Sequence, residues 1–381
     1  MEKNAKMLKI SLSEPIVGDE EQQALCDVIK SGWLAMGERV AAFEDEFAKM
    51  HGAKEAVALN SCTAALHLAL KIYNIGPGDD VLVPALTFVA TVNAILYVGA
   101  NPVFVDIESI NCPHICIDDA AGKLTDKTKA VIVMHYGGYL VDMEQWRTFS
   151  DSYGLILIED AAHAPGIEPV GRLSDASAFS FFSNKNMSTA EGGMLLTRDR
   201  SKVNHVRQLR THGMSTDTLK RYKGYAHTYQ VNMLGFNYRM DELRAAIGLV
   251  QLAHLKGWNQ KRYELSVIYR QLICTYFDEV LIPFNSGHQT AAHLLPVLLP
   301  DQVSREKVIL FLRNKGIQSS IHYPPIHKFT YYKKNFSGIR LPKTEAFCKR
   351  ELSLPLHPAL SEEDIVSVVT VLKHAIDWSK A

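Results

Sequence analysis

The sequence predicts an α/β protein that has a large, mainly parallel sheet and a smaller C-terminal α/β domain. Strand-length runs such as residues 81–83, 130–134 and 155–158 are apolar throughout, which is typical of strands buried on both faces. Helical patterns alternate with these runs, as they do in successive βαβ units. Ligands of such sheets bind at the carboxyl ends of the strands, so residues just past those ends are the first candidates for a site.

The individual elements follow from apolar periodicity, with boundaries at turn and capping residues. Residues 38–50, for example, place Val40, Phe43 and Phe47 on one helical face, and Gly52 follows the end. We predict further helices over residues 19–29, 142–153, 241–255, 263–277, 306–314 and 362–378. We predict a strand that begins at Ala56, and strands over residues 79–83, 102–106, 130–135, 154–160, 179–182, 194–196 and 293–297.

The alternation of strands and helices gives way to mostly helical segments after Gly257-Trp258. We therefore predict a boundary near Leu255, with a large domain over residues 1–255 and a small domain over residues 256–381. A chain of 381 residues is long enough for two such cores.

Composition excludes several classes of protein. Lys+Arg and Asp+Glu both total 41, so no net charge favours a nucleic acid or an anionic membrane as partner. No apolar run follows the basic residues at the N-terminus, so we find no signal peptide and expect a cytoplasmic protein. Residues 81–105 carry no charge, but Pro84 and Pro102 divide them, and we interpret them as strand, helix and strand rather than a membrane span.

The six cysteines give no recognisable metal motif. Only Cys112 and Cys116 lie close together in the sequence, and we find no second pair of ligands to complete a zinc site. We predict free thiols and no metal.

Lys185 is the first candidate for chemistry. It stands between the apolar runs 179–182 and 194–196, in a segment rich in Asn, Ser, Thr and Gly. A lysine at a sheet edge can lose part of its hydration, which lowers its pKa and lets the neutral amine carry a Schiff base. Taken alone, a solvated lysine in a hairpin loop is the more common case.

Other reactive or binding groups follow other strands. Asp160 ends an apolar strand and needs a cationic partner, either a structural ion pair or a protonated pyridine nitrogen. His163 follows three residues later, and Phe88 follows another strand. Ser61 or Thr63 can cap a helix whose N-terminus would bind an anion, although an ordinary cap has the same pattern. Lysine, acid and phosphate site together are what a pyridoxal-phosphate enzyme requires.

These motifs, in this order, resemble the DegT/DnrJ/StrS family of sugar aminotransferases, which are pyridoxal-phosphate enzymes of the aspartate-aminotransferase fold (fold type I). The resemblance spans nearly the whole chain. Its motifs are residues 31–34, 60–66, 84–91, 102–106, 159–163, 185–193, 237–240, 322–327 and 354–358.

The resemblance implies a role for each candidate. Lys185 is similar to the Schiff-base (aldimine) lysine and proton shuttle, and Asp160 to the partner of the pyridine nitrogen. His163 resembles the residue near the phenolic oxygen, and Phe88 the residue stacked on the ring. The phosphate site would consist of Ser61, Cys62, Thr63 and Ser183, with Asn237 reaching in from the neighbouring subunit of a homodimer.

The family usually has Gly where Cys62 stands. If the backbone there needs a positive φ, a cysteine is strained; if only the amide is needed, it is harmless, and we favour the second.

The implied reaction uses L-glutamate as amino donor and a nucleotide-linked keto sugar as acceptor, for amino sugar, polysaccharide or antibiotic biosynthesis. His322, Tyr323 and His327 are candidates for facing the sugar, although a structural turn explains that motif nearly as well. Two alternatives stay open: a cyclitol or related cyclic ketone as substrate, and a non-catalytic regulator that binds the cofactor. Sugar dehydratases of this kind replace the lysine by histidine, so Lys185 disfavours that reaction. The loop 211–230 is expected to influence the choice of substrate.

Overall fold

The computed structural model describes residues 9–215, 228–285 and 287–380. Part of the loop 211–230, on which we expected substrate choice to depend, lies outside the described residues. None of the described helices is both long and apolar enough to cross a membrane. Residues 81–105 are confirmed as strand, helix and strand.

The large sheet has seven strands in the order β1-β7-β6-β5-β4-β2-β3. Five neighbouring strands run parallel, and β7 runs antiparallel to both β6 and β1. The strands are β1 (Ala56–Leu59), β2 (Asp80–Pro84), β3 (Asn101–Val105), β4 (Thr128–Met134), β5 (Ile156–Asp160), β6 (Ala176–Ser180) and β7 (Gly193–Thr197). The prediction of an α/β fold with a mainly parallel sheet is therefore confirmed.

Helices cover both faces of this sheet, which is why its strands are apolar throughout. Val81 and Val83 point to the face that packs against α3 and α4, whereas Leu82 points to the opposite face, where Trp146 of α6 lies. The helices around the sheet are α2 (Glu38–Met50), α3 (Cys62–Ile72), α4 (Val89–Tyr97), α5 (Ile117–Ala121), α6 (Met143–Tyr153) and α7 (Arg200–Leu209), with the 3-10 turn η1 (Tyr136–Gly138).

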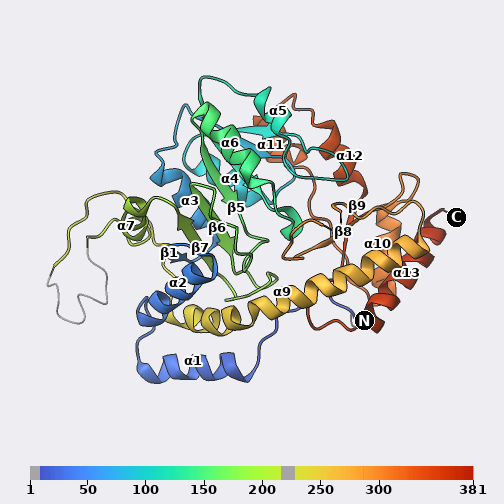
Figure 1. Ribbon diagram of the computed structural model, residues 1–381, viewed down its shortest axis with the longest axis horizontal. Coiled ribbons are helices and arrows are strands. Elements are labelled where there is room, and N and C mark those ends of the chain that lie inside the picture. Colours follow the sequence, from blue (N-terminus) through green and yellow to red (C-terminus); the bar gives the residue numbers. More distant parts are fainter. Residues whose placement is uncertain (1–8, 216–227, 286, 381) are drawn as a thin grey trace, which may run out of the picture.

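A single long helix connects the two parts of the molecule (Figure 1). α9 (Glu242–Tyr276) has 35 residues and passes without a break through Leu255 and Gly257. The predicted division into helices 241–255 and 263–277 was therefore wrong, because a lone exposed glycine costs a helix only about 1 kcal/mol and its neighbours remain packed. The domain boundary near Leu255 stays a prediction, and α9 runs across it.

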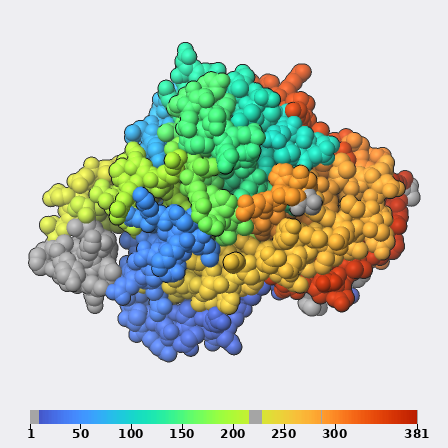
Figure 2. Space-filling view, in the orientation of Figure 1, coloured from blue at the N-terminus to red at the C-terminus, as the bar shows by residue number. Residues whose placement is uncertain are grey.

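The C-terminal part has its own core, around the antiparallel pair β8 (Leu295–Leu298) and β9 (Glu351–Leu354). Ile10 also packs into this core and forms a bridge with Ile317, so the described N-terminal residues join the C-terminal part. α9 and the C-terminal helices lie side by side in the space-filling view (Figure 2). The remaining elements are α1 (Asp19–Ser31), α10 (Arg305–Asn314), η2 (Ile326–Lys328), α11 (Thr330–Asn335), α12 (Pro342–Arg350) and α13 (Glu362–Lys380).

Candidate active site

The predicted site residues meet where strands of the large sheet end and helices begin. β5 ends at Asp160, and the turn that follows β6 carries Lys185. α3 begins at Cys62 and α4 follows Phe88, both at the same edge. The charges of Asp160 and Lys185 each act on the thiol of Cys62, so these three side chains are close neighbours.

Lys185 is half-buried on a tight turn, where its backbone N–H donates to the carbonyl of Phe182 at 2.9 Å. Burial lowers the pKa of its amine to about 8, an effect that the negative charge of Asp160 partly opposes. A substantial fraction of the amine is therefore neutral near physiological pH. Such an amine can act as a nucleophile and as a proton carrier, as we predicted from the sequence.

Asp160 is buried, and its described partners are neutral. Its Oδ2 accepts a hydrogen bond of 2.6 Å from the Thr91 hydroxyl, and its Oδ1 accepts one of 3.1 Å from the backbone N–H of Ala162. Among the described residues no cationic side chain forms an ion pair with it, and burial raises the pKa of this carboxyl. The described part of the chain thus lacks the structural ion pair that we considered for Asp160, and a cationic ligand group would compensate the buried charge.

Thr91 is a member of the site that we did not predict. It is buried one turn into α4, and its hydroxyl also contacts Thr87 at 2.7 Å. The available signal was its place in the motif 84–91, but nothing in the sequence indicates that this side chain reaches β5. The contact depends on how α4 lies on the sheet.

His163 and Tyr323 form a second pair next to the lysine. The N–H of Gly137 donates to His163 Nδ1 at 3.2 Å, so Nε2 carries the proton and donates to the Tyr323 hydroxyl at 3.0 Å. Burial, followed by the charge of Lys185, lowers the pKa of His163 well below its usual value, so the imidazole is neutral. Tyr323 comes from the C-terminal part of the chain and completes the site from that side.

The exposed side chain of Phe88 offers a surface on which a flat ligand could stack. Its side chain is 53% exposed although it directly precedes a buried helix, and its ring centroid lies 5.8 Å from that of Tyr323. An aromatic ring bound against Phe88 would remove this apolar surface from water.

The turn before α3 has the properties of a phosphate site. Ser61 caps the helix by accepting a hydrogen bond of 3.1 Å from the N–H of Ala64, and Cys62 and Thr63 are the first two helical residues. Their amides point out of the helix N-terminus, where an anion is favoured. Gly193 allows this turn to approach β7, because a Cβ there would lie 2.4–2.5 Å from the backbone of Ser61 and Cys62.

Cys62 is not strained. It lies in the first turn of α3 and is absent from the described non-glycine residues with a positive φ. The strained alternative is therefore excluded, and the requirement for the amide alone, which we favoured from the sequence, stays a prediction. Burial raises the pKa of its thiol well above the usual value, so the side chain stays neutral.

Ser183 and Asn237 are the two remaining residues that we predicted for the phosphate site. Ser183 is half-buried on the turn between β6 and Lys185. Asn237 is exposed, and its backbone oxygen accepts a hydrogen bond of 3.3 Å from the side chain of Asn60. Their roles stay predictions.

The structure separates the three candidates of the motif 322–327. His322 lies near Lys185, whose charge acts after burial to lower the pKa of the imidazole to about 4, and its Nδ1 contacts the Ser353 hydroxyl at 2.9 Å. His327 is buried away from this cluster, where its Nε2 contacts Glu345 at 3.0 Å. For His327 these contacts favour the structural interpretation.

A layer of buried polar side chains, which sequence reasoning missed, holds the lysine turn in place. Asn186 donates from Nδ2 to Asn259 of α9 at 2.8 Å and accepts from His293 Nδ1 at 2.9 Å. The His293 ring lies 4.3 Å from that of His163. The turn that carries Lys185 is thus tied both to the long helix and to the C-terminal part of the chain.

The sequence was also compared with models of protein families and with known proteins. The model of the DegT/DnrJ/EryC1/StrS aminotransferase family matches residues 15–373. The chain is 39% identical to the spore coat polysaccharide biosynthesis protein SpsC of Bacillus subtilis, over 96% of each chain.

Two solved structures are similar over nearly the whole chain. The aminotransferase PseC of Helicobacter pylori, which is involved in the biosynthesis of pseudoaminic acid, superposes with a TM-score of 0.89 at 28% identity and covers 97% of this chain and 99% of PseC. NtdA of Bacillus subtilis, solved with the bound cofactor PMP, has a TM-score of 0.84 at 28% identity and covers 94% of this chain and 81% of NtdA.

Proposed function

The chain belongs to the DegT/DnrJ/EryC1/StrS aminotransferase family, and we propose that it moves an amino group from L-glutamate to a nucleotide-linked keto sugar. It is an aminotransferase of the pyridoxal-phosphate-dependent class. The observation that carries the proposal is a buried Asp160 carboxylate without an ion pair among the described residues, next to a lysine whose pKa burial lowers to about 8.

The residues present fit this cofactor. Asp160 would accept the N–H of the pyridine ring, Phe88 would cover one face of it, and the amides at the start of α3 would bind the phosphate. When bound, pyridoxal phosphate supplies an electron sink for the carbanion that transamination requires. The buried carboxylate and the exposed phenylalanine support this arrangement, because the cofactor would provide a partner for each.

Lys185 would transfer the proton in both halves of the reaction. As a neutral amine it takes a proton from the α-carbon of the amino donor, and as an ammonium it returns a proton on the other side of the transfer. A pKa of about 8 suits both tasks, since neither protonation state is rare near neutral pH. Desolvation by burial is what keeps the pKa of this amine below its ordinary range.

His163 and Tyr323 would orient the reacting groups. The neutral His163 donates from Nε2 to the Tyr323 hydroxyl, so the tyrosine proton is free to be donated to an oxygen in the site. Since Tyr323 belongs to the C-terminal part of the chain, it can respond to the second substrate as well as to the cofactor. The proposed substrate contacts of His322 and Tyr323 rest on this position.

The choice of a sugar substrate is supported by the relatives. PseC is described by its part in pseudoaminic acid biosynthesis, and SpsC by spore coat polysaccharide biosynthesis. A nucleotide-linked keto sugar and L-glutamate are the finer parts of the proposal, and they need a direct test.

The test is an absorbance titration of the purified protein. We expect the visible band of the protein-bound cofactor to disappear on addition of L-glutamate and to return on addition of the correct keto sugar. A panel of UDP-, dTDP- and GDP-linked keto sugars, with cyclic ketones lacking a nucleotide, identifies the acceptor. Return of the band with only a nucleotide-free cyclic ketone would contradict the nucleotide-sugar proposal and support the cyclitol alternative.

The matched variants are Lys185→Ala and Lys54→Ala, the second of which changes an exposed lysine. Lys185→Ala should lose more than about 1000-fold in turnover because the proton carrier is gone, whereas Lys54→Ala should retain it. Borohydride reduction followed by peptide mapping should find the cofactor attached at Lys185 in the wild type. Turnover by Lys185→Ala at an unchanged rate would refute the assignment.

We also infer a homodimer whose sites include Asn237 of the neighbouring subunit. The inference is supported by exposed apolar side chains in the same stretch, Val231 at 57% and Leu234 at 87%, since such surface is commonly covered by a partner. Asn237 is itself exposed, as a residue that serves another subunit must be.

A further inference from the structure

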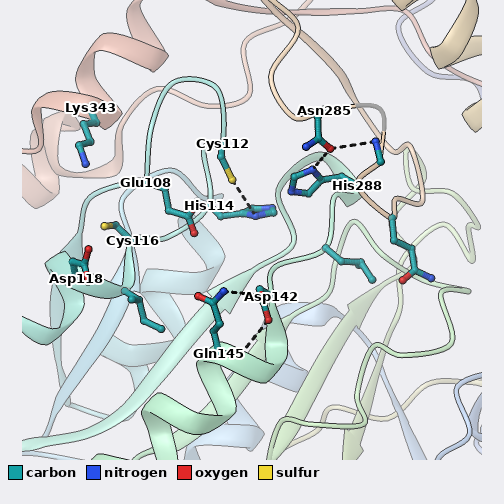
Figure 3. Close-up of a pocket in the computed structure, with 14 residues that line it drawn as sticks. Glu108, Cys112, His114, Cys116, Asp118, Asp142, Gln145, Asn285, His288 and Lys343 are labelled. Atoms are coloured by element: carbon teal, nitrogen blue, oxygen red, sulfur yellow. Dashed lines mark hydrogen bonds between the residues drawn. The ribbon is translucent and has the colours of Figure 1, made fainter.

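A polar cavity of about 870 Å³ lies outside the residues assigned to the reaction (Figure 3). One wall is the loop that follows β3, which is closed by a bridge between Ile107 and Ile115 and by a hydrogen bond of 2.8 Å from the N–H of Glu108 to the carbonyl of His114. This loop brings Cys112 and His114 to the same side of the cavity. It therefore presents a thiol and an imidazole together.

The other wall comes from the segment that leads into β8. The N–H of Phe284 donates to the carbonyl of Asn111 at 2.7 Å, and the Phe284 ring lies 4.6 Å from the ring of His114. His288 projects from this segment toward Cys112 and His114 (Figure 3). Two parts of the chain that are far apart in the sequence are thus already connected around the cavity.

The donor atoms of Cys112, His114 and His288 all lie within 4.8 Å of one another. Cys112 Sγ and His114 Nδ1 are 3.8 Å apart. Zn–S and Zn–N bonds of about 2.3 and 2.0 Å at a tetrahedral angle require a separation of roughly 3.5 Å. Side-chain adjustments of a few tenths of an ångström would therefore complete the first pair, and a movement of the half-buried His288 together with its partner Asn285 would bring in the third ligand.

Outer contacts orient both imidazoles for a metal. His114 Nε2 donates to the carbonyl of Tyr139 at 3.0 Å, which leaves the lone pair of Nδ1 facing Cys112. His288 Nδ1 donates to the side-chain oxygen of Asn285 at 2.8 Å, which leaves the lone pair of Nε2 free. A metal-binding histidine almost always donates its other N–H to such an oxygen, because this contact fixes the tautomer and the ring orientation.

A carboxylate is available as the fourth ligand. Glu108 lines the cavity and its charge acts on the Cys112 thiol, although its carboxylate lies outside the cluster of three donor residues and would have to move to bind the ion. Asp118 and Asp142 line the same cavity and add negative charge. The donor set of one thiolate, two imidazoles and one carboxylate or water matches the preference of zinc over magnesium or calcium.

We propose that Cys112, His114 and His288 bind a zinc ion, with Glu108 or a water molecule as fourth ligand. The ion joins the loop after β3 to the segment before β8 and so stabilises the contact between the sheet and the C-terminal part of the chain. We predicted no metal because the sequence holds no second pair of closely spaced ligands, whereas His288 is a single residue far from Cys112 and His114 along the chain.

The first experiment measures zinc in the untagged holoenzyme by mass spectrometry after gel filtration, and again after chelation and reloading with zinc sulfate. We expect about one zinc per chain, and a melting temperature that falls on chelation and recovers on reloading. No zinc in the protein as purified, and none retained after reloading, would overturn the proposal.

Matched variants separate a built site from adventitious binding. Cys112→Ser and His288→Gln should weaken zinc binding at least 10-fold, whereas Cys116→Ser, which changes a thiol in the same cavity but outside the donor cluster, should bind as the wild type does. His254→Gln, at an exposed histidine, is the control for His288. Equal zinc binding by all four variants would show that these residues hold no site.

A measurement on the wild type covers the case in which a variant fails to fold. Zinc should protect Cys112 from alkylation, with little effect on Cys116, when the modified peptides are quantified by mass spectrometry. Cofactor absorbance should be the same with and without zinc, because the site is separate from Lys185. An equal alkylation rate of Cys112 in the presence and absence of zinc would also overturn the proposal.

Discussion

Single residues set the chemistry of the active site through burial rather than through close pairing with opposite charges. Burial lowers the pKa of Lys185, raises that of Asp160 and keeps His163 neutral. All three shifts favour the form that carries less charge, which is the expected effect of a site with little water. A cationic ring bound at Asp160 would lower the pKa of that carboxyl again, so the site favours a ligand with a protonated ring.

Substitution of Thr91 measures how much its neutral hydrogen bond to Asp160 contributes to activity. Thr91→Val keeps the shape of the side chain but removes the hydrogen bond of 2.6 Å to the carboxylate. Because a hydrogen bond to a charged group contributes about 1.5–3 kcal/mol, we expect kcat/KM to fall roughly 10- to 100-fold. Steady-state kinetics with L-glutamate measure this. Thr91→Ser, which keeps the hydroxyl, should recover most of the activity, and equal losses in both variants would contradict the role of the hydroxyl.

Glu351 provides a test of stability against pH. Burial raises the pKa of this carboxyl to about 8, although the Ser353 hydroxyl and the N–H of His322 oppose the shift. Between the unfolded pKa of about 4.3 and the folded value, the folded state binds more protons, so the free energy of unfolding falls as the pH rises. Glu351→Gln removes this dependence while keeping the size of the side chain.

The expected difference is on the order of 2 kcal/mol in the free energy of unfolding between pH 6 and pH 8. Urea denaturation of the wild type and of Glu351→Gln at a series of pH values measures it. Parallel stability profiles for the two proteins would show that Glu351 titrates in its ordinary range.

At the scale of elements, glycines have opposite roles in α9 and next to α3. Gly257 is exposed within α9 and a Cβ there would meet no atom within 4 Å. Gly257→Ala should therefore stabilise the protein by about 0.5–1 kcal/mol, because alanine loses less conformational entropy in a helix. Chemical denaturation measures the change, and a decrease in stability would indicate that α9 is interrupted near this residue.

Gly193→Ala is the contrasting substitution. A Cβ at this position would lie 2.4–2.5 Å from the backbone of Ser61 and Cys62, closer than any real contact. The turn before α3 would have to move, and we expect weaker cofactor binding together with lower stability. Unchanged cofactor affinity would mean that this turn does not hold the phosphate.

At the scale of the whole molecule, the proposed homodimer with a shared site makes a prediction about mixed dimers. Lys185→Ala and Asn237→Ala should each be inactive or nearly so at low cofactor concentration. When the two are co-expressed, half of the dimers are mixed and each mixed dimer has one intact site, so we expect roughly a quarter of the wild-type activity. Assays of the purified mixture, with each variant alone as control, measure this.

Absence of complementation in mixed dimers, shown to be present by differential tags, would place Asn237 in the site of its own subunit. A monomer in gel filtration with light scattering would remove the basis of the shared site altogether. Both outcomes leave the assignment of Lys185 untouched, because that assignment depends on residues within one chain.

The local sequence was sufficient for most of the elements and for the class of enzyme. Strand and helix positions follow from apolar runs and from capping residues, so the helix 38–50 was predicted with its observed bounds. Asp160 became a candidate because it ends an apolar strand, where burying a charged side chain is costly without a partner. Lys185 became one through its place in the order of family motifs, and the roles of both residues stay predictions. The prediction of two helices in place of α9 was wrong. We interpreted a single glycine as a boundary, although its neighbours remain packed and the helix continues past it.

Only the tertiary structure decided the contacts between distant segments. Tyr323 reaches His163, Thr91 reaches Asp160, and His288 reaches Cys112, and none of these pairs is adjacent in the sequence. The sequence by itself determined the fold class, most of the elements and the family to which the chain belongs, because apolar periodicity, capping residues and motifs are properties of neighbours along the chain. Which of these residues work together depends on how the sheet, α9 and the C-terminal part pack, and that packing is a property of the whole folded molecule.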